Sequence, residues 1–88
     1  MSAADKARAA DECMVWAARE LERAGKQIRA ADYAKAIGTL TDAIEWAEDA
    51  RLAAVQAYRA GGHSWTEVGE ALGMSKQAAW GKYSGRLE

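Results

Sequence analysis

Side chains that could carry out catalysis are few in this chain of 88 residues, and they stand apart from one another. Cys13 is the single cysteine and His63 the single histidine, so we expect neither an internal disulfide nor a metal site. Ser64 follows His63, but no third group is placed to orient the imidazole as a base. A glycine-rich phosphate loop and a plausible pair of catalytic carboxylates are also missing from the sequence. We therefore expect no enzyme activity, no metal and no cofactor.

Positive charge gathers near the C-terminus, where it could contact phosphates. Residues 75–87 contain Lys76, Lys82 and Arg86 and no acid, whereas residues 1–58 carry 8 Lys or Arg against 10 Asp or Glu. The net charge of −1 argues weakly against a nucleic-acid partner, because phosphate binding usually leaves a basic footprint. Lys82 and Arg86 also lie near a predicted helix C-terminus, where the macrodipole favours cations. Phosphate contact and local helix stabilisation are thus both open for these two residues.

The composition predicts that these charges are carried by helices. Alanine supplies 22 residues and proline none, which favours an all-α protein because alanine loses no side-chain entropy in a helix. The sequence has no apolar run near the roughly 18 residues that a membrane span needs, and "MSAADKARAADE" lacks the pattern of a signal peptide. We therefore expect a cytoplasmic protein without a membrane segment.

Two long amphipathic helices are predicted in residues 1–60, where apolar residues recur at spacings of mostly three and four. The first stripe consists of Ala7, Ala10, Met14, Ala17, Leu21, Ala24 and Ile28. The second consists of Tyr33, Ile37, Leu40, Ile44, Ala47, Ala54 and Tyr58. Because the two stripes can bury each other, we expect a long antiparallel hairpin, with Gly25 as a helix stop and Asp32 as an N-cap between its helices.

Two tryptophans, Trp16 and Trp46, lie off these stripes. One interpretation is that they pack on the third and fourth helices, since aromatic side chains contribute heavily to small cores. The other is that they form an apolar patch for a partner subunit, since large exposed aromatics are enriched at interfaces.

A third helix is predicted directly after Gly61 and Gly62, which end the second. "SWTE" is a capping box, in which the hydroxyl of Ser64 accepts from the N–H of Glu67 and the Glu67 carboxylate reaches back. Trp65, Val68 and Leu72 are expected on the inner face of this helix. Gly69 leaves room for another helix to approach closely.

A fourth helix is predicted after a three-residue turn. Gly73 can adopt the left-handed conformation that closes a helix, Met74 can fill the angle between helices, and Ser75 can cap the next helix. The expected arrangement of residues 61–88 is therefore helix, short turn, helix.

The segment "WTEVGEALGMSKQAAWGKYSG", residues 65–85, resembles the helix-turn-helix of bacterial and phage DNA-binding proteins. Val68, Leu72, Gly73 and Met74 stand at the hydrophobic and turn positions of that motif. The segment is particularly similar to "SW-x-E-[IV]-G-x-ALG-[VM]-S-[RK]-QAAW", which occurs in many short helix-turn-helix proteins of high-GC bacteria and their phages. The resemblance does not extend to residues 1–58.

The chain departs from the family pattern at two positions. Ala79 and Lys82 stand where branched aliphatic residues are usual. We expect Trp80 and Tyr83 to supply the missing bulk and to belong to the core, since aromatics on short terminal helices usually anchor them.

The resemblance implies that the helix starting at Ser75 enters the DNA major groove while the preceding helix spans the backbone. Lys76 would donate to guanine O6 or N7 and Gln77 would pair with adenine, whereas Gly81 offers no side chain, so specificity per half-site should be modest. Phosphate contacts are expected from the remaining residues of the implied site. The implied DNA-binding residues are Thr66, Ser75, Lys76, Gln77, Gly81, Lys82 and Arg86.

These observations together predict one all-α domain, in which a long antiparallel helical hairpin (residues 1–60) supports a C-terminal helix-turn-helix (residues 61–88). We expect a small bacterial or phage transcriptional regulator that binds double-stranded DNA. A homodimer through the N-terminal helices would double the contacts and offset the weak charge. The alternative is a helical interaction module that binds a host or transcription-machinery protein, which the acidity and the two tryptophans favour.

Overall fold

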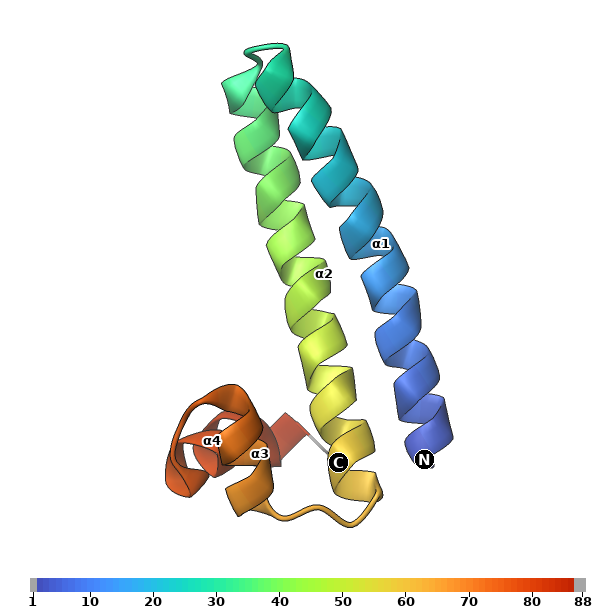
Figure 1. The fold of residues 1–88 in the computed structure, drawn as a ribbon, viewed down its shortest axis with the longest axis vertical. Coiled ribbons are helices and arrows are strands. Elements are labelled where there is room, and N and C mark those ends of the chain that lie inside the picture. The colour runs from blue at the N-terminus through green and yellow to red at the C-terminus, as the bar shows by residue number, and fades with distance from the viewer. Residues whose placement is uncertain (1, 87–88) are drawn as a thin grey trace.

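The computed structural model describes residues 2–86 and is all-helical in that range, as the composition predicts (Figure 1). It contains α1 (Ala3–Arg29), α2 (Tyr33–Ala60), α3 (Trp65–Leu72), α4 (Lys76–Tyr83) and a 3-10 turn, η1 (Ser84–Arg86). The first two helices form the predicted long antiparallel hairpin, and α3 and α4 lie beside the C-terminal end of α2, opposite α1 (Figure 1). The last two residues of the predicted segment 61–88 lie outside the described residues. None of the described helices is both long and apolar enough to cross a membrane.

Small residues hold the hairpin together. The buried positions on α1 are Ala17 and Ala24. Those on α2 are Ala36, Thr39, Ala43, Ala50, Ala53 and Val55, of which Val55 belongs to a separate core with α3 and α4. Alanine brings two helix axes close together, so that larger side chains are displaced to the edges of the contact.

The prediction that the two apolar stripes bury each other is therefore wrong. Six large members of these stripes are between 46 and 67% exposed, namely Met14, Leu21, Ile28, Tyr33, Ile37 and Ile44. Only the alanines of the first stripe at positions 17 and 24 are buried in the contact, because they lie on the side of α1 that faces α2.

The turn between the long helices is also not where the sequence predicted it. The first helix continues through Gly25 to Arg29, and Ala31 takes the left-handed conformation with φ of 58°. The N–H groups of Ala31 and Asp32 donate to carbonyls of the last turn at 3.0 and 2.8 Å, which satisfies the helix end. Asp32 does hold the N-cap position of α2, but its side chain makes no capping hydrogen bond and pairs with Lys35 at 3.6 Å instead.

Trp16 and Trp46 stack on each other across the hairpin, with ring centroids 5.9 Å apart and an interplanar angle of 21°. The expectation that they pack on the third and fourth helices is therefore wrong, because residues 16 and 46 meet at one level of the α1–α2 contact. Trp16 stays 46% exposed, so the interpretation as a patch for a partner stays a prediction.

The core that joins α3 and α4 to α2 consists of Val55, Val68, Ala79 and Tyr83. Partly buried apolar residues surround it, namely Leu52, Trp65, Leu72 and Met74. The inner face predicted for the third helix is thus confirmed, as is the placement of Met74 in the angle between helices.

Candidate nucleic-acid interface

The start of α3 is fixed by the predicted capping box. The N–H of Glu67 donates to the Ser64 hydroxyl at 3.2 Å, and the N–H of Ser64 donates to the Glu67 carboxylate at 3.1 Å. The second carboxylate oxygen lies 2.8 Å from Nδ1 of His63, whose ring stacks on Tyr58 with centroids 3.9 Å apart. These interactions, chiefly the hydrogen bond with His63, lower the pKa of Glu67. The loop that connects α2 to α3 is therefore tied at both ends.

The turn between α3 and α4 depends on two glycines. Gly73 has φ of 72°, and the N–H of Met74 donates to the carbonyl of Gly69 at 2.9 Å. A Cβ atom on Gly69 would lie 2.8 Å from the carbonyl oxygen of Met74 and 3.1 Å from that of Ser75. The predicted role of Gly73 in helix termination is confirmed. The close approach predicted at Gly69 is also present, although the segment that approaches is the backbone of the turn and of the α4 cap rather than a helix.

Ser75 caps α4 as predicted. Its hydroxyl accepts from the N–H of Ala78 at 3.1 Å and its carbonyl accepts from the N–H of Ala79 at 3.0 Å. The N–H groups of Lys76 and Gln77 belong to the first turn, where a helix offers no internal acceptor. Because Ser75 and both residues are exposed, this end of α4 presents free donors and the positive end of the helix dipole to solvent.

One face of α4 is buried against the core. Ala79 is 0% and Tyr83 1% exposed, so Tyr83 supplies the bulk that the small Ala79 lacks, as predicted. Trp80 is 56% exposed, and the prediction that it belongs to the core is wrong. Residues in a helix are about 100° apart, so the position after Ala79 turns away from the buried line.

The exposed side of α4, which begins next to the buried one, carries the predicted base-reading residues. Lys76, Gln77 and Gly81 line one shallow hollow together with Trp80. A Cβ atom on Gly81 would meet nothing within 4 Å, so the hollow is open at this position. Sequence reasoning did not assign Trp80 to this face, although its spacing of four from Lys76 and three from Gln77 is the signal for it.

Lys82 and Arg86 lie away from this hollow, on the side of α4 and η1 that approaches α2. Both contribute to lowering the pKa of Glu48 on α2, which is lowered chiefly by the hydrogen bond from Arg51. The carbonyl of Arg86 also accepts a hydrogen bond from the Gln56 side chain at 2.9 Å. The structure therefore places the predicted site residues of α4 and η1 in two groups, one around the hollow and one, Lys82 and Arg86, on the flank that approaches α2.

Thr66 and Ser75 are both exposed, each at the start of one of the two short helices. Residues 2–86 contain no group of three or more His, Cys, Asp or Glu that could hold a metal ion. The chain matches no protein-family model, no curated protein and no solved structure.

Proposed function

We propose that α3 and α4 form a helix-turn-helix that binds double-stranded DNA, and that the chain acts as a small transcriptional regulator rather than as an enzyme. The observation that carries this proposal is the division of α4 into two faces. Ala79 and Tyr83 are buried, while Lys76, Gln77 and Gly81 share one exposed hollow. A helix that is anchored along one side and exposes Lys76 and Gln77 in its first turn suits insertion into the major groove.

The base-reading roles follow from the chemistry of the exposed side chains. Lys76 donates to guanine O6 or N7, and Gln77 makes a bidentate pair with adenine. The open position at Gly81 leaves room for a thymine methyl group, and the exposed indole of Trp80 beside it adds apolar contact with that group.

Phosphate contacts complete the proposed site. Ser75 and the free N–H groups of the first turn of α4 bind one phosphate, and Thr66 reaches another from α3. Lys82 and Arg86 neutralise phosphates on the flank of α4. With only a few cationic contacts per chain, binding at physiological salt requires two copies, and we place the dimer contact on the N-terminal helices.

A second candidate function is binding to a protein through the same region. The exposed Trp80 favours it, because tryptophan is enriched in protein interfaces and a base-reading helix does not need one. This candidate predicts binding that depends on Trp80 and not on salt.

The test is fluorescence anisotropy of a labelled mixed-sequence duplex, followed by a preferred site once one is selected. Lys76→Ala and Gln77→Ala are each expected to weaken specific binding by about 1–3 kcal/mol, with helix content unchanged. Lys35→Ala is the matched control, because Lys35 is an exposed lysine in the first turn of α2. That end of α2 is the one away from α4 (Figure 1). Absence of binding at low salt by folded protein would refute DNA binding and favour the protein partner.

A further inference from the structure

The six exposed apolar residues of the hairpin follow regular spacings. Met14, Leu21 and Ile28 are seven residues apart, and each lies four residues after an alanine at position 10, 17 or 24. Since two helical turns take about seven residues, these side chains form one line along α1 beside the buried alanines.

Matching lines run along α2. Tyr33 and Leu40 are seven residues apart, as are Ile37 and Ile44, and both lines lie on the same rotational side of the buried alanines at 36 and 43. In an antiparallel pair of helices, residues that are rotated away from the contact in the same sense on each helix point to the same side of the hairpin. The lines of α1 and α2 therefore form one apolar face, whereas the other side carries the stacked Trp16 and Trp46 together with Asp42 and Asp49.

The extent of this apolar face approaches that of a protein interface. Six large side chains that are each about half exposed present on the order of 600 Å², at the upper limit of the roughly 300–600 Å² that the largest patch of a monomer covers. A stable interface buries roughly 800 Å² per partner. Leu40, Ala47 and Ala54 extend the same face, so its area suits one further copy of the hairpin.

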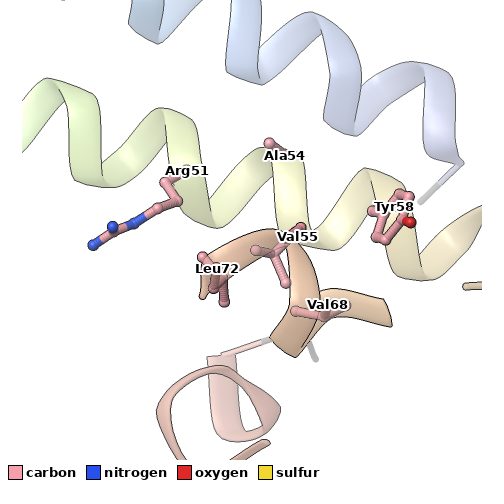
Figure 2. A pocket seen from close by; sticks show the side chains of 7 residues that line it. Arg51, Ala54, Val55, Tyr58, Val68 and Leu72 are labelled. Carbon is pink, nitrogen blue, oxygen red and sulfur yellow. The ribbon is translucent and has the colours of Figure 1, made fainter. Parts of the chain in front are cut away.

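The apolar face continues into a cavity of about 340 Å³ between α2 and α3 (Figure 2). Ala54 continues the line of Leu40, while Arg51 and Tyr58 continue the line of Ile37 and Ile44, again at spacings of seven. From the α3 side the cavity is lined by Val68, Ala71 and Leu72. Arg51 is thus the one cationic residue in an otherwise apolar groove.

The charged residues on the apolar face indicate how a second copy is oriented. Trp16 and Trp46 stack on each other, so they lie at one level along the hairpin. Because the two helices are antiparallel, Asp11, five residues before Trp16, and Arg51, five residues after Trp46, also share one level. Asp11 lies at the outer edge of the apolar face, because it is three residues before Met14 and follows Ala10 on α1 as Ile37 follows Ala36 on α2. In a two-fold dimer with parallel hairpins, α1 of each copy faces α2 of the other, so Asp11 of one copy meets Arg51 of the other.

The opposite orientation leaves these charges unmatched. With antiparallel hairpins α2 faces α2, and Arg51 gains no carboxylate from the second copy, so that only its pair with Glu48 offsets the cost of its desolvation. Arg51 already pairs with Glu48, but its guanidinium has five N–H donors and can bind both carboxylates.

We propose that a second copy of this chain docks on the apolar face with its hairpin parallel, so that the first half of its α1 covers the cavity between α2 and α3 and its Asp11 pairs with Arg51. The product is a four-helix bundle with both α3–α4 pairs at one end. This inference rests on the hairpin and not on DNA binding, and holds if the protein binds no DNA.

The test is the mass of the full chain in solution by sedimentation equilibrium. We expect a dimer, and we expect Leu21→Glu to raise its dissociation constant by roughly 100-fold or more, because each dimer would bury two unpaired carboxylates. Val15→Glu is the matched control, since Val15 is similarly exposed on the outer side of α1. A monomeric wild type, or equal effects of both substitutions, would overturn the proposal.

Orientation is tested separately. Asp11→Arg should weaken the dimer and the double variant Asp11→Arg, Arg51→Asp should restore it, with circular dichroism showing intact helices throughout. A spin label at Ala30→Cys, in a Cys13→Ala background, should give a short distance between copies. A label-to-label distance near the 46 Å length of the molecule would place the two turns at opposite ends and overturn the parallel arrangement. Absence of rescue by the double variant would overturn it as well.

Discussion

Gly69 and Gly81 offer a comparison in which the same substitution should have opposite effects on stability. Each glycine lies within a short helix, where replacement by alanine stabilises the helix by up to about 1 kcal/mol. At Gly81 the added methyl group meets nothing within 4 Å, so this gain should be observed in full. At Gly69 the methyl group would lie 2.8 Å from the carbonyl oxygen of Met74. The atoms that must move belong to the backbone of the turn and not to a flexible side chain.

Overpacking costs about 1–3 kcal/mol, and a contact of 2.8 Å with backbone atoms belongs to the upper part of that range, about 2–3 kcal/mol, which exceeds the gain in helix propensity. We therefore expect Gly69→Ala to lower the free energy of unfolding by about 1–2 kcal/mol once the propensity gain is subtracted. Gly81→Ala should raise it by about 0.5–1 kcal/mol. The difference corresponds to more than about 6 °C in Tm for a domain of this size.

Urea denaturation followed by tryptophan fluorescence and circular dichroism, at one protein concentration, measures both variants. DNA binding adds a second readout, because Gly81→Ala fills the hollow beside Gln77 and should weaken site preference while stabilising the fold. If Gly69→Ala were as stable as Gly81→Ala, the turn would not lie on α3 as the structure describes, and the argument for the placement of α4 would fail.

Three further predictions concern single positions. Ala31→Gly should stabilise the protein by about 1 kcal/mol in thermal denaturation, because the left-handed φ of 58° strains any residue with a Cβ atom. Ala43→Leu should lower the free energy of unfolding by about 1–3 kcal/mol in urea titration, since this alanine is buried between the long helices. Glu67, with its lowered pKa, stabilises the fold above pH 4.5 and loses this contribution as the pH falls further. The Tm advantage of wild type over Glu67→Gln should therefore shrink below that pH, and a constant difference would contradict the role of the carboxylate.

Local features of the fold were predictable because the atoms that determine them lie within a few residues of one another. The capping box of Ser64 and Glu67, the glycines that end α2 and α3, and the cap of α4 at Ser75 each involve one helix end. The close approach at Gly69 was predictable for the same reason, since only four residues separate it from the turn.

Features that depend on contacts between distant segments were not predictable. Gly25 looked like a helix stop, but α1 continues past it because packing on α2 outweighs the propensity cost of one glycine. Of the two interpretations of Trp46, the one that packs it on the third and fourth helices fails because the register of the hairpin decides that it meets Trp16. Trp80 lies one position beyond the buried line of α4, and an eight-residue helix has too few turns to show that line in its sequence.

The prediction that the two apolar stripes of the hairpin bury each other is wrong for a different reason. Periodicity shows which side of a helix is apolar, and it does not show which chain covers that side. The alanines at 17, 24, 36 and 43 are small enough to bring the two helices together, and this same closeness leaves no space between them for Met14, Leu21 or Ile44. A hairpin that buries alanine and exposes leucine and isoleucine leaves much of the apolar area of its helices in contact with water. In the proposed dimer the large residues of both stripes become buried against the second copy. The stripes would then correctly predict which residues are buried, and the prediction would be wrong only in assigning that burial to the other helix of the same chain. Docking also brings two α4 helices to one end of the bundle. Since each α3–α4 pair alone offers few cationic contacts for DNA, the dimer would supply the second set that the proposed DNA binding requires.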